Sequence, residues 1–253
     1  MVVQHNLTAM NANRQLSGVT SAQAKSTEKL SSGYRINRAA DDAAGLSISE
    51  KLRSQIRGLD KAASNSQDGI SLVQVAEGAL NETHSILQRM NELATQAAND
   101  TNTSTDRNAL QKEMDQLTSE IDRIRSTTQF NSMNLLDGSF TGKELQVGAL
   151  SGQKISISIG NMNSSKLKIS GLKVSSFSSA GKAMTAIQKA INSVSTQRSK
   201  LGAIQNRLEH TINNLNTTSE NTSAAESRIR DVDMATEMVE YSKNNILAQA
   251  GQS

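Results

Sequence analysis

The sequence predicts a mainly α protein, an elongated antiparallel helical bundle or coiled coil with a small β-hairpin. The 253-residue chain contains no proline, so nothing in it forces a break in a long helix. Only 36% of its residues are hydrophobic and 2% are aromatic, which suits thin aliphatic seams better than a compact globule filled by rings. Apolar residues also recur at three- and four-residue spacing over several long stretches, as on one face of a helix.

Two helical tracts are expected in the N-terminal part of the chain. The first covers about residues 7–30 and has only a weak seam of small residues. The second covers about residues 46–98 and follows a loop that is punctuated by glycine and alanine. Gly58 and Gly69 lie inside the second tract, and each costs about 1 kcal/mol relative to alanine in a helix. A break or bend is therefore expected to be possible near either glycine.

Three further tracts follow. One begins after "NDTNTST", a cluster of residues that favour turns and helix N-caps, and keeps a four-three rhythm of apolar residues to Ile124. The next covers about residues 181–215, and the last covers about residues 224–250. Arg198 and Gln205 occupy seam positions, where polar residues usually fix the register at a cost in stability. The last tract presents an apolar face formed by Ile229, Val232, Val239, Ile246 and Leu247.

Between the helical tracts the hydrophobic period changes to two. "KISISIG" alternates three isoleucines with polar residues, which predicts a strand with one buried face. The preceding "ELQVGA" and the turn at Ser151 and Gly152 complete a hairpin at about 144–160, which must pack against the helices to be stable. Residues 161–180 are rich in Ser, Asn and Lys and are expected to form a short polar surface excursion.

The two ends of the chain carry opposite charge. Residues 1–40 hold five basic side chains against Glu28 alone, and residues 219–253 hold six acidic side chains against three basic ones. Pairing of the two ends is the simpler interpretation, and a polyanionic partner of the basic end is the alternative. Few aromatic side chains are present to stack on bases, and no nucleic-acid motif occurs. No stretch approaches the ~18 uninterrupted apolar residues of a membrane span, so we expect neither a nucleic acid nor a membrane as partner.

No group of catalytic or metal-binding residues is recognisable in the sequence. The chain has no cysteine, and His5, His84 and His210 are isolated on different tracts. Asp41 and Asp42 suggest a cation site at first sight, but capping of the following helix explains them better. We therefore expect a structural protein without catalytic residues, metal or cofactor.

Long stretches of the chain resemble bacterial flagellin. They are "LSSGYRINRAADDAAGLSISEKLRSQIRGL" (30–59), "NSQDGISLVQVAEGALNETHSILQR" (65–89), "TQFNSMNLLDG" (128–138), "LGAIQNRLEHTINNL" (201–215) and "AAESRIRDVDMATEM" (224–238). These matches occur at both ends in the order of the family and cover nearly the whole chain. They are far more specific than a heptad pattern.

The resemblance implies a structural subunit of the bacterial flagellar filament, a secreted protein that self-assembles into an extracellular helical tube for motility. Residues 1–33 and 219–253 would form a terminal coiled coil in the inner core, and residues 34–218 the outer-core domain. Residues 161–180 would stand in place of the variable outer domains, as in a minimal flagellin. The family usually continues several helical turns past "ILAQAGQS", so the C-terminal end of the inner core is expected to be truncated.

The resemblance also implies a route of export and a set of partners. The N-terminal stretch "MVVQHNLTAMNANRQL" lacks the pattern of a secretory signal, which fits a family that leaves the cell through the flagellar type III channel. The expected partners are further copies of the chain, the flagellar cap and the hook-associated proteins. An export chaperone of flagellin is a further partner, although it binds at the C-terminal end that is expected to be truncated.

A second implied role is that of a monomeric ligand for the flagellin-sensing Toll-like receptor of animal hosts. Flagellins that this receptor recognises carry Gln-Arg followed by Glu-Leu on the second tract. The matching residues are Gln88, Arg89, Glu92 and Leu93, and Glu113 on the next tract matches a further contact. From periodicity alone these residues are equally a solvated helix face, with Leu93 in the core. Within the structural class, a hook–filament junction protein is the alternative, since it shares terminal helices with flagellin.

Overall fold

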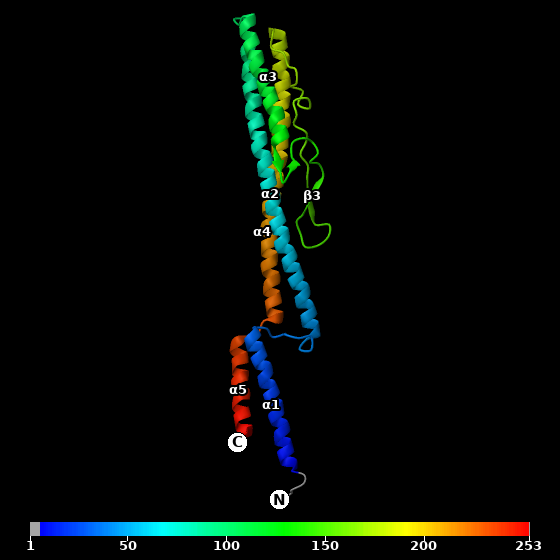
Figure 1. The fold of residues 1–253 in the computed structure, drawn as a ribbon, viewed down its shortest axis with the longest axis vertical. Helices are drawn as coiled ribbons and strands as arrows, with labels where there is room; N and C mark the ends of the chain where they lie inside the picture. The colour runs from blue at the N-terminus through cyan, green and yellow to red at the C-terminus, as the bar shows by residue number, and fades with distance from the viewer. Residues whose placement is uncertain (1–5, 253) are drawn as a thin grey trace. The chain divides into compact units, whose positions relative to one another are not determined.

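The structure is a computed structural model that describes residues 6–252 of the chain (Figure 1). Over these residues it has five helices: α1 (Leu7–Ser32), α2 (Ala43–Ala97), α3 (Ser104–Thr127), α4 (Phe177–Arg230) and α5 (Met234–Gln252). Two antiparallel pairs of short strands complete it: β1 (Gln129–Phe130) with β2 (Met133–Asn134), and β3 (Lys143–Gln146) with β4 (Lys154–Ile157). The predicted mainly α class with a small β-hairpin is confirmed.

The chain divides into two compact units. Unit 1 contains the described parts of residues 1–57 and 217–253, and unit 2 contains residues 58–216. Helices α2 and α4 each contribute residues to both units. The predicted division into an inner-core and an outer-core domain refers to positions in a filament, so it stays a prediction.

Unit 2 is held together by an aliphatic core between α2, α3 and α4. Fully or almost fully buried side chains come from all three helices: Leu80, Leu87, Met90 and Leu93 of α2, Met114 and Ile121 of α3, and Ile187, Val194 and Leu201 of α4. Burial of each large aliphatic side chain stabilises the fold by about 1.5–3 kcal/mol. The three- and four-residue spacing seen in the sequence is therefore the spacing of this core.

Helix α3 begins at the turn that the sequence predicts, directly after the N-cap residue Thr103. The Thr103 hydroxyl accepts a hydrogen bond from the Asp106 N–H, and the Asp106 carboxylate accepts one from the Thr103 N–H at 2.9 Å. This capping box satisfies two backbone N–H groups at the start of the helix. Arg107 Nε donates to the carbonyl oxygen of Ala97 at 3.1 Å and so closes the end of α2. The two helices consequently run antiparallel (Figure 1).

The hairpin packs its apolar face on the helices, as predicted. Ile155, Ile157 and Ile159 are buried, and Leu145 of β3 lies opposite Ile155 of β4. Asn65 of α2 donates from Nδ2 to the Gln146 carbonyl oxygen at 3.1 Å. Side-chain packing and this hydrogen bond fix the hairpin to α2.

Helix α2 has no break at its glycines, because these residues serve close packing instead. A Cβ atom at Gly58 would lie 2.9 Å from the Cβ of Ala149, and one at Gly69 would lie 2.7 Å from Cδ1 of Leu145. Both neighbours belong to the hairpin and its loop. The two glycines therefore let the hairpin approach the helix backbone.

The predicted polar seam of α4 makes one link to α2. Arg198 donates from Nε and Nη2 to Glu77 Oε1 at 2.8 and 2.7 Å. Gln205 instead donates to Glu209 on its own helix at 2.9 Å. Arg198 is thus the seam residue whose side chain joins the two helices.

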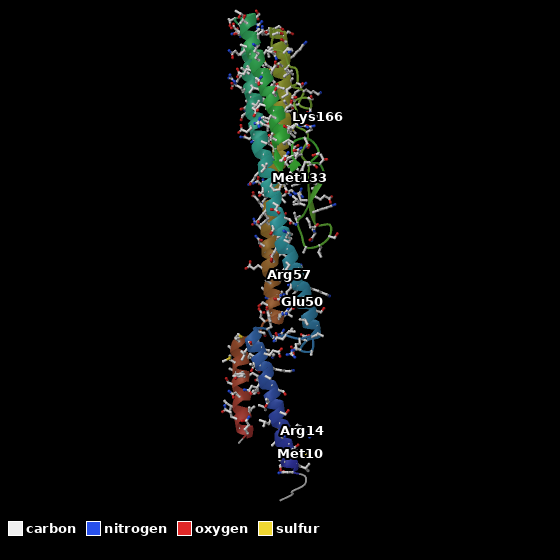
Figure 2. The ribbon with its side chains drawn as sticks, viewed as in Figure 1. Met10, Arg14, Glu50, Arg57, Met133 and Lys166 are labelled. Carbon is white, nitrogen blue, oxygen red and sulfur yellow. The ribbon has the colours of Figure 1, made fainter. Side chains whose placement is uncertain are left out.

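Residues 161–180 do not form a polar surface excursion, and this prediction is wrong for their apolar side chains. Met162, Ile169 and Val174 are buried in the core of unit 2. Lys166 is exposed on the outer side of the segment (Figure 2). The buried residues are irregularly spaced among Ser, Asn and Lys, so no helical or strand period revealed them.

The boundary between the last two helices also differs from the prediction. Helix α4 continues to Arg230, through the polar stretch 216–223 that separated the predicted tracts. Helix α5 starts only after Asp233, whose carboxylate accepts hydrogen bonds from the N–H groups of Ala235 and Thr236. Asp233 is the N-cap, and the Thr236 N–H is the main cause that lowers its pKa. The polar stretch thus continues α4, and the next helix begins only where Asp233 caps it.

In unit 1, α1 and α5 lie side by side (Figure 1), as the opposite charges of the chain ends predict. Lys29 and Glu237 form an ion pair between them at 3.4 Å. Among the described residues of the two helices, the buried ones are Ser26, Asn244 and Ala248. Met10 of α1 is labelled in Figure 2 and is exposed. Both tyrosines of the chain, Tyr34 and Tyr241, belong to this unit.

Candidate interaction surfaces on α2, α3 and α5

Four of the five predicted receptor-binding residues lie together on the surface of unit 2. We call Gln88, Arg89, Glu92 and Glu113 the Arg89 cluster. The guanidinium of Arg89 donates to Glu113 Oε1 from Nε at 3.0 Å and from Nη2 at 2.9 Å. It also donates from Nη1 to Glu92 Oε2 at 3.1 Å. One arginine of α2 is therefore held between carboxylates of its own helix and of α3.

The helical period explains why these side chains gather. Leu87 and Met90 point into the core, so Gln88, Arg89 and Glu92 fall on the opposite, exposed face of α2. The capped turn at Thr103 folds α3 back along α2 and brings Glu113 beside this face. Gln88 is additionally within hydrogen-bond distance of His84, at 3.1 Å.

The electrostatics of the Arg89 cluster favour recognition rather than proton transfer. Hydrogen bonds to Glu113 first, and to Glu92 second, raise the pKa of the Arg89 guanidinium above its ordinary value. Arg89, Glu92 and Glu113 keep 51%, 68% and 44% of their side-chain surface exposed. Exposed ion pairs contribute little to folding stability, so this charged arrangement remains available to a partner.

Leu93 does not belong to this surface. Its side chain is fully buried in the core of unit 2, where it packs with the other aliphatic residues of α2. A direct contact between Leu93 and a partner is therefore excluded in this conformation. Of the two interpretations that periodicity allowed, the core role is the one the structure supports.

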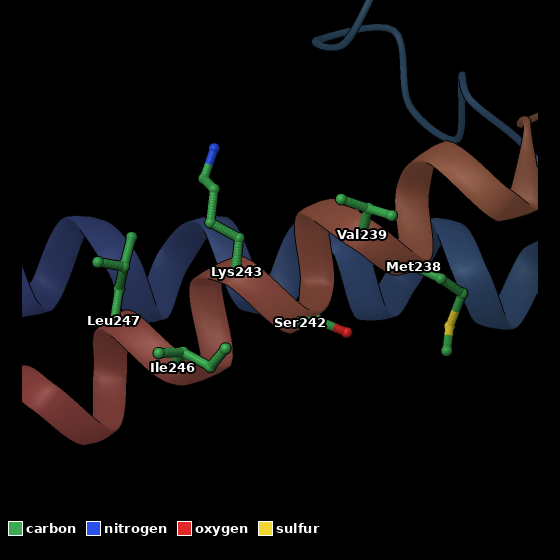
Figure 3. A pocket seen from close by; sticks show the side chains of 6 residues that line it. All are labelled: Met238, Val239, Ser242, Lys243, Ile246 and Leu247. Atoms are coloured by element: carbon green, nitrogen blue, oxygen red, sulfur yellow. The ribbon is translucent and has the colours of Figure 1, made fainter.

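A second surface lies on α5, whose large apolar side chains are exposed. Val239, Ile246 and Leu247 belong to the apolar face predicted for the last tract, and they are 70%, 66% and 46% exposed. With Met238, Ser242 and Lys243 they line a shallow groove of about 510 Å³ (Figure 3). Figure 3 shows these side chains on α5 with α1 running behind it. We call these six residues the α5 groove.

Close approach of the two terminal helices explains this exposure. Helix α5 turns its Asn244 and Ala248 inward, and a Cβ at Gly251 would lie 3.3 Å from Cδ1 of Leu16. Small residues let helices approach closely, whereas the large aliphatic residues of α5 need more room. The sequence predicted an apolar face on this helix, but the pattern does not show which face of the helix packs against α1.

The paired aspartates are structural. Asp42 Oδ1 accepts a hydrogen bond from the Gly45 N–H at 2.8 Å, which confirms its role as the cap of α2. Asp41 accepts from the N–H groups of Asn37 and Arg38, and the Arg38 N–H is the main cause that lowers its pKa. Asp42 thus caps α2 as predicted, whereas Asp41 binds the backbone of the preceding loop and caps no helix.

The described part of the chain shows no metal site. Within residues 6–252, no group of three or more His, Asp or Glu side chains is placed to hold a metal ion. His84 lies in α2 and His210 in α4, while His5 lies outside the described residues. No helix in this range is both long and apolar enough to cross a membrane.

Aliphatic helical seams, a pair of terminal helices and the absence of a metal site in residues 6–252 are typical of a structural protein. Comparison with known families makes this specific. Residues 3–141 match the bacterial flagellin N-terminal helical region, and residues 184–253 match the bacterial flagellin C-terminal helical region. Together these matches cover well over half of the chain.

Several curated proteins are similar over the whole chain. The flagellin of Halalkalibacterium halodurans is 55% identical, over 100% of this chain and 94% of the relative. The flagellin of Bacillus subtilis is 51% identical, with the same coverage. A flagellar filament 31.3 kDa core protein of Treponema maltophilum is 48% identical, over 99% of this chain and 93% of the relative. Among solved structures, Bacillus cereus flagellin has a TM-score of 0.55 and 34% identity, over 64% of this chain and 94% of that one.

The chain therefore belongs to the bacterial flagellin family, as its sequence resemblance predicts. It is a structural protein of the extracellular flagellar filament and not an enzyme. A hook–filament junction protein is not favoured. A putative flagellar hook-associated protein of Vibrio parahaemolyticus has a TM-score of 0.64 but only 14% identity, which shows a shared fold alone.

Proposed function

We propose that the chain leaves the cell through the flagellar type III channel and polymerises with further copies of itself into the helical tube of the filament. The α5 groove is the observation that supports polymerisation best. It exposes large aliphatic side chains on a helix whose inner face is already occupied by α1. Contiguous apolar surface of this kind usually marks a protein contact, because its exposure to water is unfavourable.

The proposed assembly assigns a place to each part of the chain. Residues 1–33 and 219–253 form the inner core, where the exposed Leu7, Met10 and α5 groove meet neighbouring copies. Residues 34–218 form the outer core, and residues 161–180 occupy the place of the variable domains. The flagellar cap and hook-associated proteins bind the same terminal helices at the two ends of the filament. The flagellin export chaperone binds the C-terminal end before export.

Seeded polymerisation followed by electron microscopy tests the assembly proposal. We expect Val239→Asp and Ile246→Asp each to abolish elongation, because a carboxylate in the α5 groove cannot be buried without a partner. Gln249→Asp is the matched control, since Gln249 is exposed on the same helix and does not line the groove. If both groove variants elongate filament seeds as fast as the unchanged chain does, the proposal is contradicted.

The export route has its own test. A flagellated strain that expresses the chain should release it into the medium, and an isogenic strain without the type III export ATPase should retain it. Equal release from both strains would exclude this route.

We also propose that the monomer binds the flagellin-sensing Toll-like receptor through the Arg89 cluster. Support comes from the matching residues and from the fixed, exposed guanidinium of Arg89 between Glu92 and Glu113. Leu93 is left out of this contact because it is buried, and it acts only by supporting the helix. Arginine held in a defined orientation is well suited to bidentate recognition of a partner's carboxylate or carbonyl groups.

Receptor binding by the purified monomer tests this second role. We expect Arg89→Ala to weaken binding by an order of magnitude or more, and Glu113→Gln to weaken it less, because Arg89 keeps its pair with Glu92. Arg123→Ala is the matched control, since it breaks an exposed pair of the same kind with Glu120 on α3. If Arg89→Ala binds the receptor as tightly as the unchanged chain does, the proposed role of the Arg89 cluster is contradicted.

A further inference from the structure

Met238 stands at the N-terminal end of the α5 groove. Its side chain is 50% exposed, and the exposed Val239 and Ile246 continue the apolar surface of the groove. Figure 3 shows the Met238 side chain, with its sulfur in yellow, projecting from α5. A thioether is a polarizable apolar group that fits well into a protein contact, and it is also open to oxidation. The chain has no cysteine, so its methionines carry all of its sulfur.

Exposure and position together separate Met238 from the other methionines. Packing in the core of unit 2 shields three of them, Met90, Met114 and Met162. The exposed ones within residues 6–252 are Met10, Met133, Met234 and Met238. Of these four, Met238 is the one that lines the α5 groove. An oxidant that meets the unassembled chain therefore changes the chemistry of the groove at one residue.

Oxidation of Met238 requires only a peroxide. A lone pair of the sulfur attacks one oxygen of hydrogen peroxide, so an S–O bond forms and the O–O bond breaks. The hydroxide that leaves takes up the proton of the transferred oxygen and departs as water. The thioether is thus oxidised by two electrons to a sulfoxide, and the peroxide is reduced by two electrons. Methionine sulfoxide reductases reverse the change, because their thiols return two electrons and the oxygen leaves as water.

A sulfoxide is poorly suited to the α5 groove. It turns an apolar side chain into a polar, chiral one that carries a strong hydrogen-bond acceptor. Apart from the Ser242 hydroxyl, the side chains of the groove offer it no ready donor, because Lys243 already donates to both carboxylate oxygens of Glu240 at 2.9 Å. Burial of the oxidised side chain against another copy leaves a polar group without an adequate partner, which is unfavourable.

Access of an oxidant to Met238 before assembly does not depend on the fold of the terminal helices. The side chain is exposed on the surface of α5, and a segment without helical structure exposes it further. A neighbouring copy seated on the groove covers it. The sulfur is therefore open in the free chain in either case, and the contact that polymerisation forms is the one that closes it.

We propose that Met238 is a redox-sensitive position that controls polymerisation: peroxide oxidation of the unassembled chain prevents its incorporation, and incorporation shields the sulfur from oxidation. This proposal rests on the proposed function, in which a neighbouring copy covers the α5 groove. Because the sulfoxide can be reduced again, the block is reversible, unlike the loss of a subunit through unfolding or cleavage.

Seeded polymerisation of the full chain, with and without prior treatment with hydrogen peroxide, tests the proposal. Treatment of the unchanged chain should slow elongation by about tenfold or more, and methionine sulfoxide reductases acting on both epimers should restore it. Met238→Leu keeps an apolar side chain of similar volume that peroxide does not oxidise, so its elongation should be the same before and after treatment. Met234→Leu is the matched control, since Met234 is also exposed on α5 but does not line the groove. Treatment should slow this control as much as the unchanged chain.

Peptide mass spectrometry supplies a second measurement. Met238 sulfoxide should form readily in the treated monomer, and its formation in assembled filaments should be slower by about tenfold or more. Met90 is fully buried in unit 2, so it should stay unoxidised in both and shows that the treated subunit keeps its core. Absence of the sulfoxide at Met238 in the treated monomer, or equal rates of its formation in monomer and filament, overturns the proposal.

The outcomes distinguish this proposal from the proposed function. If the untreated chain elongates seeds and the oxidised chain does so equally fast, the redox proposal is overturned and polymerisation stands. If treatment slows Met238→Leu as much as the unchanged chain, the block comes from another methionine and the redox proposal is again overturned. If the untreated chain takes up no seeds, polymerisation itself is contradicted, and the redox proposal with it.

Discussion

The core of unit 2 and the pair of terminal helices in unit 1 use the same kind of sequence in opposite ways. In unit 2, most of the large aliphatic residues of α2, α3 and α4 point inward, and those at the centre of the core are fully buried. In unit 1, the large aliphatic residues of α5 point outward, and Asn244 and Ala248 point inward. An amphipathic period thus shows that a helix has two faces, but it does not show which face is satisfied within one chain.

This difference assigns the two units different tasks. Unit 2 gains its stability from contacts within the chain, so it is expected to be folded as a monomer. Unit 1 leaves the apolar face of α5 exposed, so its order is expected to depend on neighbouring copies. Substitutions that act on one unit and not on the other can break or sharpen this comparison.

The largest expected effect is a cavity in the core of unit 2. Leu87→Ala should lower the free energy of unfolding by about 2–5 kcal/mol, because Leu87 is fully buried among aliphatic neighbours. Met238→Ala on the exposed face of α5 is the control and should leave it almost unchanged in the monomer. Urea denaturation followed by circular dichroism measures both. Equal losses would mean that the two units do not differ as described.

Two glycines of α2 should respond to the same substitution with opposite signs. Gly58→Ala brings a Cβ to 2.9 Å from Ala149 and should lower stability by about 1–2 kcal/mol, since overpacking outweighs the better helix propensity. Gly78→Ala should raise stability by up to about 1 kcal/mol, because no atom lies within 4 Å of the added Cβ. Thermal unfolding of the two variants gives the comparison. A stabilising Gly58→Ala would show that the hairpin loop is not held against α2.

The capping box at the start of α3 should have a smaller effect. Thr103→Ala removes the hydroxyl that accepts from the Asp106 N–H, and it should cost about 0.5–2 kcal/mol. Ser104→Ala, at the next and exposed position, is the control. Hydrogen exchange should show faster opening of the first turn of α3 in Thr103→Ala alone. If both variants behave alike, the capping box has no role of its own.

The smallest expected effect is a pH dependence that appears first in unit 1. The side chain of Arg230 lowers the pKa of Glu50 below its ordinary 4.5, and the Thr236 N–H lowers that of Asp233 below 3.8. The unfolded chain then binds more protons than the folded one as the pH falls. The stability that these carboxylates give is therefore fully present above about pH 4.5 and is lost as the pH falls through their folded pKa values.

A pH series of hydrogen-exchange experiments checks this expectation. Protection of α5 should decrease before that of α3, although Asp106, Glu120 and Asp137 in unit 2 also have lowered pKa values. Unit 2 has the larger hydrophobic core, so it stays folded when the stabilising contribution of its carboxylates is lost. Asp233→Asn should flatten the dependence in α5, and earlier loss in α3 would contradict the comparison.

Periodicity predicted most of the fold because large aliphatic residues dominate the core of unit 2. It located all the helical tracts to within a few residues at most ends, and it placed Ile155 and Ile157 on the buried face of the hairpin. It failed for residues 161–180, where Ile169 and Val174 are buried without a regular period. It also could not show that Gly58 and Gly69 make room for the hairpin, because the contacts come from distant residues.

The candidate surfaces were predictable in part for the same reason. The exposed positions of Gln88, Arg89 and Glu92 follow from the helical period, and contact with Glu113 follows from an antiparallel turn. Whether Leu93 belonged to the surface or to the core was undecidable from its spacing. The α5 groove was missed because a seam and an outer apolar face have the same period. Only the helix that packs on α5 distinguishes a seam from an outer face, and that helix is α1, which is far away in the sequence.

The location of both tyrosines in unit 1 has a practical consequence. The chain has no tryptophan, so near-ultraviolet emission comes from Tyr34 and Tyr241. Tyr34 lies against the guanidinium of Arg230, and Tyr241 lies on α5. Intrinsic fluorescence therefore reports on the terminal helices and their junction, while far-ultraviolet circular dichroism mainly follows the long helices. The natural sequence thus carries a label-free optical probe that can follow the ordering of its ends separately from the rest of the molecule.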